Sequence, residues 1–460
     1  MATVSRALDR IKQDLDSHLP PADILKACAA EGYRWRERKL GPVLTIHLFL
    51  LQILHLNTAI VHLRHLICQP LNPAAYCKAR MRLPLKVLER LLYQSASSLR
   101  QQLDRRLGED LSCWRGHRTL LVDGTGTITP DTPPLQKEFG QPPGTRPGCA
   151  LPVPKVLGLF DAMTGLILQV TAFAGMVHES ARLTTLHPFI EAGDLLVGDR
   201  AYCSFAHLAM LAARQVHALL RLHQSSRVSF RPHRPHFDRR KSPAGRKRQK
   251  GRPRSKFVRR LQRYDQIVRW IKPEFRRKNS AWMSREQYDR LPEELELREL
   301  RYWIVRPGSR TRVVTLITTL LDPALYPKDS LAELYGLRWR VETHLRNLKI
   351  TLKMRRLKCQ KEQGVRKELI AYALVYNLVH AVMARAAAAQ QTTPDRISFI
   401  DVLRWLWTAQ PDKIPLFVVN PVREGRSEPR AVKDYQTKFP GFPKPRKIIK
   451  EQMQKKCGVK

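Results

Sequence analysis

Apolar residues recur at the spacing of a helix through the first quarter of the chain. The pattern covers Pro42–Leu66 and Leu83–Leu107, where one side of each segment is apolar. Between them, a basic stretch from Asn72 to Pro84 is bounded by turn-forming residues, which predicts a short helix. Two interpretations fit this arrangement equally well: a helix-turn-helix motif that binds a DNA end, and a helical bundle with a solvated basic edge.

The pattern changes at His117 to short apolar runs of strand length. The first run, Thr119–Val122, leads into Asp123 and a glycine, and a later run from Leu195 to Gly198 leads into Asp199. The remaining segments are a proline-rich loop (131–154), a hairpin (156–173), helical stretches (180–190 and 204–214) and a further strand (216–222). The order strand, hairpin, helix, strand, helix, strand predicts a mixed α/β fold, with helices on the faces of a sheet.

A basic, strand-rich segment interrupts this order between residues 225 and 320. Its first part contains the run Gly245–Arg254, whose Gly-Arg-Pro core is similar to that of arms that bind the minor groove. A solvated basic loop is the simpler interpretation of the run, and we favour it. Strands are expected at 266–271, 297–305 and 311–319. The segment is too long for a connection, so we interpret it as an inserted subdomain.

The stretch from Tyr335 to Lys349 predicts one amphipathic helix, which follows a capping box formed by Ser330 and Glu333. At about 100° per residue, one stripe of this helix is apolar. A second stripe gathers a phenol, cations and one carboxylate: Tyr335, Arg338, Glu342, Arg346 and Lys349. One interpretation is that these hydrogen-bond donors, gathered around a single carboxylate, bind a phosphate backbone with a metal ion beside it. The alternative is a surface helix whose charged residues form ordinary ion pairs. Helices are expected again at 366–388 and 399–407, before a polar tail.

The charge of the chain indicates a polyanionic partner. Its 82 Lys and Arg and 40 Asp and Glu give a net charge of +42, an excess that nucleic acid usually neutralises. A membrane is not expected as a partner, because polar residues interrupt the most apolar run, Val43–Ala59. The start of the chain lacks an apolar signal region, and the eight cysteines form no Cys-x-x-Cys pair. We therefore expect reduced thiols in a cytoplasmic protein.

Three carboxylates carry the candidate chemistry: Asp123, Asp199 and Glu342. Carboxylates on adjacent core elements can hold two Mg²⁺ ions about 4 Å apart, which activate an attacking oxygen and stabilise a leaving one. Each aspartate alone is more often a turn residue, so only the combination favours a metal site.

Other acidic motifs are set aside. We interpret Asp161 and Asp194 as turn residues. His178-Glu179 lacks the second histidine of a zinc-protease helix, and Asp123-Gly-Thr-Gly-Thr lacks the lysine of a phosphate-binding loop.

Taken together, these motifs resemble the DDE transposases of bacterial insertion sequences. The matching residues are Leu-Leu-Val-Asp123-Gly-Thr, Leu-Val-Gly-Asp199-Arg-Ala-Tyr, and Tyr335-x2-Arg338-x3-Glu342-x6-Lys349. The last spacing is similar to the Tyr-Arg-Glu-Lys signature of the insertion-sequence-four type. The resemblance covers roughly Thr119 to His380 and is less specific for the N-terminal helices.

The resemblance implies a ribonuclease-H-like catalytic core with a β-rich insertion before the Glu helix. It implies that Asp123, Asp199 and Glu342 bind Mg²⁺, for which Mn²⁺ can substitute. It also implies that Tyr335, Arg338 and Lys349 hold DNA phosphates near the transposon end, and we add Arg346 and Arg200 as DNA-binding candidates. In better-known members a tryptophan of the insertion stacks a flipped base. Trp270 and Trp303 are candidates for this role here, although each is more readily explained as a core residue.

We accordingly divide the chain into five parts: a helical N-terminal domain that binds DNA ends (1–115), the first part of the catalytic core (116–224), the basic insertion (225–320), the second part of the core with the Glu helix (321–408), and a basic tail (409–460).

The expected function is that of a transposase in the bacterial cytoplasm, associated with the nucleoid. It would bind terminal inverted repeats, cleave double-stranded DNA and join the freed 3′-hydroxyls to target DNA, and the family suggests a homodimer in the synaptic complex. The alternatives are a non-catalytic DNA-binding protein of transposase descent and a metal-dependent nuclease that cuts without joining.

Overall fold

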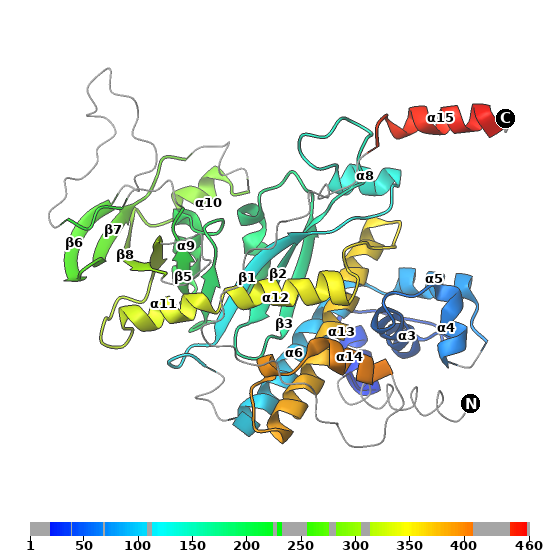
Figure 1. Cartoon of the computed structure of the whole chain (residues 1–460), viewed down its shortest axis with the longest axis horizontal. Helices are drawn as coiled ribbons and strands as arrows, with labels where there is room; N and C mark the ends of the chain where they lie inside the picture. The colour runs from blue at the N-terminus through cyan, green and yellow to red at the C-terminus, as the bar shows by residue number, and fades with distance from the viewer. Residues whose placement is uncertain are drawn as a thin grey trace.

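A nine-stranded sheet with helices packed against it organises the molecule (Figure 1). The computed structural model describes residues 19–37, 39–67, 70–107, 113–223, 228–231, 255–275, 282–304, 313–407 and 442–457. Within these described residues, the strands of the sheet lie in the order β3-β2-β1-β4-β5-β9-β8-β7-β6. The expected mixed α/β class is therefore confirmed.

The N-terminal part is helical, as expected. Its described helices are α2 (Pro21–Ala30), α3 (Pro42–Leu54), α4 (Ile60–Ile67), α5 (Pro73–Arg82) and α6 (Leu85–Leu107). The short basic helix is confirmed as α5, which is capped by the Asn72 side chain accepting a hydrogen bond from the backbone N–H of Ala75 at 3.1 Å. The helical spacing of apolar residues through Pro42–Leu66 corresponds to two helices, α3 and α4. Leu56 and Asn57 adopt the left-handed conformation, with φ of 56° and 54°, and separate α3 from α4.

The central strands place two apolar cores on opposite faces of the sheet. They are β1 (Thr119–Gly126), β2 (Lys155–Asp161), β3 (Ile167–Phe173), β4 (Leu195–Gly198) and β5 (His217–Arg221). Because side chains alternate along a strand, Leu121 joins the core under α6 and the long helix α13 (Glu362–Ala389). Leu120 and Val122 join the other core, under η1 (Glu179–Phe189) and α9 (Phe205–Ala213). The sheet is thus covered by helices on both faces.

Two local expectations in this region need correction. The proline-rich segment 131–154 contains a helix, α8 (Pro133–Phe139), because prolines are compatible with the first turn of a helix. The helical stretch expected at 180–190 is the 3₁₀ helix η1, which begins at Glu179.

The inserted segment adds strands to the same sheet. Its elements are β6 (Ser255–Gln262), β7 (Asp265–Ile271), α10 (Arg285–Asp289), β8 (Glu294–Trp303) and β9 (Val313–Thr318). β9 pairs antiparallel with β5, with Leu219 opposite Thr318, so the insertion continues the edge of the core sheet. The run Gly245–Arg254 lies outside the described residues. The proposed domain boundaries themselves stay a prediction.

The stretch expected to form a single helix after Pro327 is built from three pieces. These are α11 (Lys328–Gly336), α12 (Trp339–Arg346) and the π-helical turn η3 (Asn347–Thr351). Between α11 and α12 the backbone tightens, because the N–H groups of Arg338 and Val341 each bond the carbonyl three residues earlier. The expected capping box is also absent, since α11 begins at Lys328 after Pro327 and Ser330 lies inside its first turn.

The helix α13 packs against α6 (Figure 1) and is followed by η4 (Pro394–Arg396), α14 (Phe399–Trp407) and α15 (Arg446–Cys457). By length and composition α13 could cross a membrane, and it is the one such helix among the described residues. Yet 94% of its most apolar window is buried inside the protein, as expected for a core helix.

Candidate active site

Two neighbouring parallel strands bring the two aspartates to the same edge. Val122 on β1 is in register with Gly198 on β4, so Asp123 and Asp199 follow at adjacent positions. Gly198 allows close packing there, because a Cβ would lie 3.0 Å from the Val122 side chain and 3.1 Å from Tyr202. β1 continues beyond Asp123 along β2 as far as Gly126. Asp123 therefore ends the buried part of its strand and not the strand itself.

The Arg338 guanidinium contacts both the β1 carboxylate and the α12 carboxylate. Its Nη1 lies 3.7 Å from Asp123 Oδ2, and its Nη2 lies 3.7 Å from Glu342 Oε1. The Arg338 side chain is 7% exposed, whereas that of Glu342 is 53% exposed. Glu342 therefore faces solvent beside a buried cation.

The ionisation of Asp123 is altered by its surroundings. Burial raises its pKa to about 6, and the carboxylates of Glu179 and Asp199 add to the rise. The backbone N–H of Gly124, which donates to Asp123 Oδ1 at 2.8 Å, and the Arg338 guanidinium oppose it. Acidic groups crowded in this way favour a cation among them.

A fourth acid, Glu179, lies at this site, although its sequence motif did not indicate it. A Cβ on Gly124 would be 2.6 Å from Glu179 Cδ, so the Glu179 carboxyl group rests on the backbone next to Asp123. The Tyr202 hydroxyl donates a hydrogen bond to Glu179 Oε2 at 3.2 Å. The sequence indicated only that His178-Glu179 does not belong to a zinc-protease helix, which is correct but assigns Glu179 no role. The available signal was the glycine after Asp123, which leaves room for a close neighbour.

The donor set of the site fits Mg²⁺. Three of its buried polar atoms have no hydrogen-bond partner: Asp199 Oδ1, Tyr335 Oη and Arg338 Nε. Since buried polar atoms are nearly always paired, Asp199 Oδ1 is open to a cation, whereas Tyr335 Oη and Arg338 Nε are open to an anionic acceptor. In the described part of the chain, no three His, Cys, Asp or Glu side chains are already arranged around one metal position. Carboxylate oxygens are nevertheless the ligands that Mg²⁺ prefers, and Asp123, Asp199 and Glu342 can supply them.

The remaining DNA-binding candidates differ in position. Tyr335 is buried at the end of α11, where burial raises its pKa and its electrostatic neighbours include Arg338 and Asp199. Arg200 is half-buried directly after Asp199. Arg346 is exposed in the last turn of α12, and Lys349 is half-buried in η3. The structure thus places Tyr335 and Arg338 beside the carboxylates. Arg346 and Lys349 lie on the segments that follow Glu342, at the end of α12 and in η3.

The two candidate tryptophans of the insertion are not equivalent. Trp270 is 6% exposed and donates to Glu299 Oε1 at 3.2 Å, which confirms a core position. Trp303 is 45% exposed and packs edge-on against Tyr264, with ring centroids 4.7 Å apart. The expectation of a core position was therefore wrong for Trp303, the one of the two that a base can reach.

Two acids near the motif are structural, as interpreted from the sequence. Asp161 is buried, pairs with Arg100 and accepts hydrogen bonds from the turn amides of Met163 and Thr164. Asp194 forms a two-pronged pair with Arg118. Both carboxylates are already satisfied within the fold.

Comparison with known proteins identifies relatives of the chain. The family model described as "Transposase DDE domain" matches residues 114–378. Transposase InsG for insertion sequence element IS4, from Escherichia coli (strain K12), is 26% identical over 398 residues, which cover 81% of this chain and 79% of that protein. Among solved structures, a piggyBac transposase synaptic complex with hairpin DNA matches with a TM-score of 0.36 and 10% identity, over 86% of this chain and 79% of that one. A pre-cleavage Mos1 transpososome matches with a TM-score of 0.16 and 11% identity, over 40% of this chain and 60% of that one.

Proposed function

The chain belongs to the family of transposases with a DDE domain, and from this premise we propose a specific activity. The protein is the enzyme of an insertion sequence that binds terminal inverted repeats and cleaves double-stranded DNA in the presence of Mg²⁺. It then joins the freed 3′-hydroxyls to target DNA. The observation that carries this proposal is the adjacency of Asp123 and Asp199 on paired strands, with Arg338 linking Asp123 to Glu342.

The proposal includes a ribonuclease-H-like catalytic core. The strands β3-β2-β1-β4-β5 with helices on both faces support it, as does the position of the acids where β4 ends. The N-terminal helices would bind the DNA ends, and the insertion, with the exposed Trp303, would contact the DNA beside the cut.

Asp123, Asp199 and Glu342 would hold the Mg²⁺ ions. When bound, Mg²⁺ activates the attacking water or 3′-hydroxyl and stabilises the leaving oxygen of an in-line displacement at phosphorus. Glu179, held by Tyr202, supplies a fourth carboxylate beside Asp123. Its negative charge favours the binding of cations at this edge of the sheet.

Arg338 and Tyr335 would orient the scissile strand. Arg338 has an unpaired Nε and two nitrogens that lie 3.7 Å from carboxylates, which is longer than a hydrogen bond. With its carboxylate neighbours engaged elsewhere, the Arg338 guanidinium would be free to donate to a DNA phosphate, for which its planar geometry is suited. The unpaired Tyr335 hydroxyl is a second donor at the same place.

Two further features of the proposal rest on the family and the composition. The synapsis of two DNA ends calls for a homodimer, and the protein would work at the nucleoid in the bacterial cytoplasm. The net charge of +42 supports a DNA partner. A non-catalytic DNA-binding protein would share the fold and charge but not the need for the carboxylates, and a nuclease would cut without joining.

The test is the cleavage of a labelled duplex that carries the element's own end, taken from the DNA flanking the gene. We expect specific nicking with Mg²⁺ and none after chelation with EDTA. Binding without cleavage under both conditions would contradict the enzymatic assignment.

A further inference from the structure

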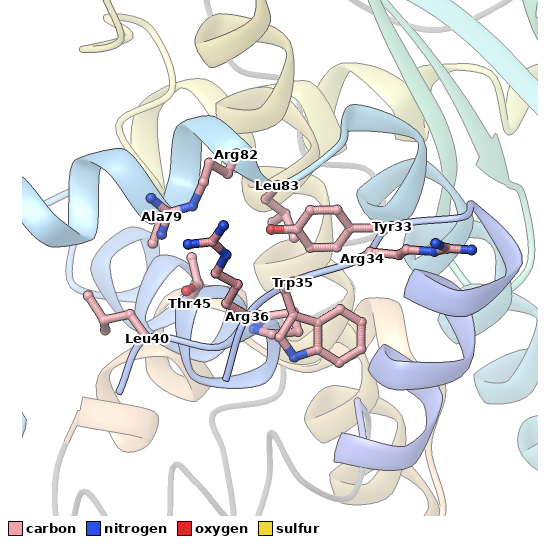
Figure 2. A pocket seen from close by; sticks show the side chains of 10 residues that line it. Tyr33, Arg34, Trp35, Arg36, Leu40, Thr45, Ala79, Arg82 and Leu83 are labelled. Carbon is pink, nitrogen blue, oxygen red and sulfur yellow. The ribbon is translucent and has the colours of Figure 1, made fainter. Parts of the chain in front are cut away.

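The N-terminal helical part contains a cavity of ≈ 460 Å³ that shares no residue with the candidate active site (Figure 2). It lies among the segment that follows α2, the start of α3 and the end of α5. Its volume falls within the range of about 300–1,000 Å³ that is usual for pockets of small ligands.

One side of the cavity offers hydrogen-bond donors and positive charge. In Figure 2 the guanidinium groups of Arg36 and Arg82 and the hydroxyl of Tyr33 point toward the same space. Arg82 acts directly on this phenol, because it opposes the rise in the Tyr33 pKa that burial causes. Within the described residues, no carboxylate forms an ion pair with Arg36 or Arg82. Two guanidinium groups without a carboxylate partner among the described residues, beside a phenol, form a site for an anion, and for phosphate in particular.

The other side of the cavity offers an aromatic surface. Tyr33 and Trp35 form a tilted pair with ring centroids 5.9 Å apart, the separation of rings in direct contact. A further ring has no room between them, so it would stack on the free face of Trp35, whose side chain is 37% exposed. Bases stack on aromatic side chains in this way, without dependence on sequence.

We propose that this cavity binds one unpaired nucleotide of DNA, with its phosphate on Arg36 and Arg82 and its base on Trp35. The nucleotide must be unpaired, because both faces of a base inside a duplex are covered by its neighbours. The inference rests on the proposed action on DNA. It adds a site in the N-terminal helices that would hold a frayed or flipped nucleotide while the carboxylates act elsewhere.

The experiment uses the full chain and a 5′-phosphorylated DNA pentanucleotide with 2-aminopurine as its first base. Stacking on Trp35 quenches the fluorescence of 2-aminopurine, whereas binding through phosphates alone changes only the anisotropy of a label at the 3′ end. We expect quenching by the wild type and its loss in Trp35→Ala. Arg36→Ala and Arg82→Ala should each weaken binding roughly ten- to a hundred-fold, as expected for hydrogen bonds to a charged group.

Arg64→Ala is the matched control, because Arg64 is exposed on α4 and does not line the cavity. It should change the affinity less than twofold. Equal weakening in Arg36→Ala and Arg64→Ala would show non-specific attraction and overturn the proposal, as would undiminished quenching in Trp35→Ala. Competition by inorganic phosphate as strong as that by deoxyadenosine monophosphate would overturn the base contact. Asp123→Asn should bind the probe like the wild type, so a failure here is distinct from a failure of the catalytic proposal.

Discussion

The Arg338 guanidinium lies 3.7 Å from the Asp123 carboxylate, and the Arg338 side chain is only 7% exposed. If Arg338 serves to hold a DNA phosphate, Arg338→Ala should lower the rate of end cleavage about ten- to a hundred-fold, because a charge-assisted hydrogen bond is lost. The melting temperature of the Arg338→Ala variant should stay close to that of the wild type. Arg340→Ala, which removes a half-exposed neighbour paired with Asp395, is the control and should cleave normally. A variant that unfolds, or one that cleaves at the wild-type rate, would favour a purely structural ion pair.

Glu179 should contribute to cation binding at the carboxylates. Glu179→Gln keeps the size of the side chain and removes its charge, so we expect weaker binding of Mn²⁺, measured by electron paramagnetic resonance of the free ion. Gly124→Ala should act in the same direction, since the added Cβ would meet Glu179 Cδ at 2.6 Å and displace it. Glu286→Gln, at an exposed surface pair on α10, is the control. Unchanged Mn²⁺ affinity in Glu179→Gln, with clear loss in Asp123→Asn, would exclude Glu179 from the site.

Arg298 links the insertion to the core, while its buried ion-pair partner Asp265 lies in the insertion itself. Arg298 and Asp265 are both 0% exposed, and Arg298 also donates to the Tyr326 carbonyl at 2.7 Å, just before α11. Asp265→Ala leaves a buried guanidinium without its partner, so the free energy of unfolding should fall by about 3–5 kcal/mol in urea titrations. The exposed pair of Arg269 and Glu296 offers the comparison, and Glu296→Ala should cost less than about 1 kcal/mol. Equal costs for the two variants would contradict the anchoring role.

Two buried histidines should make the protein less stable in acid. Burial lowers the pKa of His187 and of His207 to about 4, from 6.5 in an exposed side chain. Between these values the unfolded chain binds protons that the folded protein does not, so the free energy of unfolding falls as the pH decreases from 6.5 toward 4. Above pH 6.5 the histidines are neutral in both states and this contribution is constant.

His207→Phe tests this pH dependence, because phenylalanine can keep the stacking on Trp282 and cannot be protonated. Urea unfolding at several pH values should show a shallower loss of stability below pH 6.5 than in the wild type. The same slope in both proteins would mean that His207 does not contribute.

The sequence was sufficient for the parts of the site that depend on local pattern. Apolar runs leading into Asp123 and Asp199 marked the strands, and the mixed α/β class followed from the order of elements. What it could not supply was the pairing of β1 with β4, which depends on contacts between segments distant in the chain. Glu179 was missed for the same reason, since a 3₁₀ helix far from Gly124 in sequence brings it to the site.

Regular periodicity also concealed local breaks. The apolar pattern of Pro42–Leu66 continues through Leu56 and Asn57, yet the Asn57 amide donates to the distant Glu368 at 2.6 Å and turns the chain there. The backbone makes tighter turns around Arg338 and a wider, π-helical turn in η3. Side chains that a constant angle per residue would place on one stripe therefore point in different directions. Such departures arise from tertiary contacts, which no local pattern records.

The central claim is that Asp123, Asp199 and Glu342 act together to cut and join DNA. The most direct measurement is strand transfer into a target plasmid by pre-cut element ends bearing 3′-hydroxyls, in Mg²⁺. The wild type and Glu333→Gln, a control on the exposed side of α11, should form joined products, and Asp123→Asn, Asp199→Asn and Glu342→Gln should form none. Joining at the wild-type level by Glu342→Gln would contradict the claim.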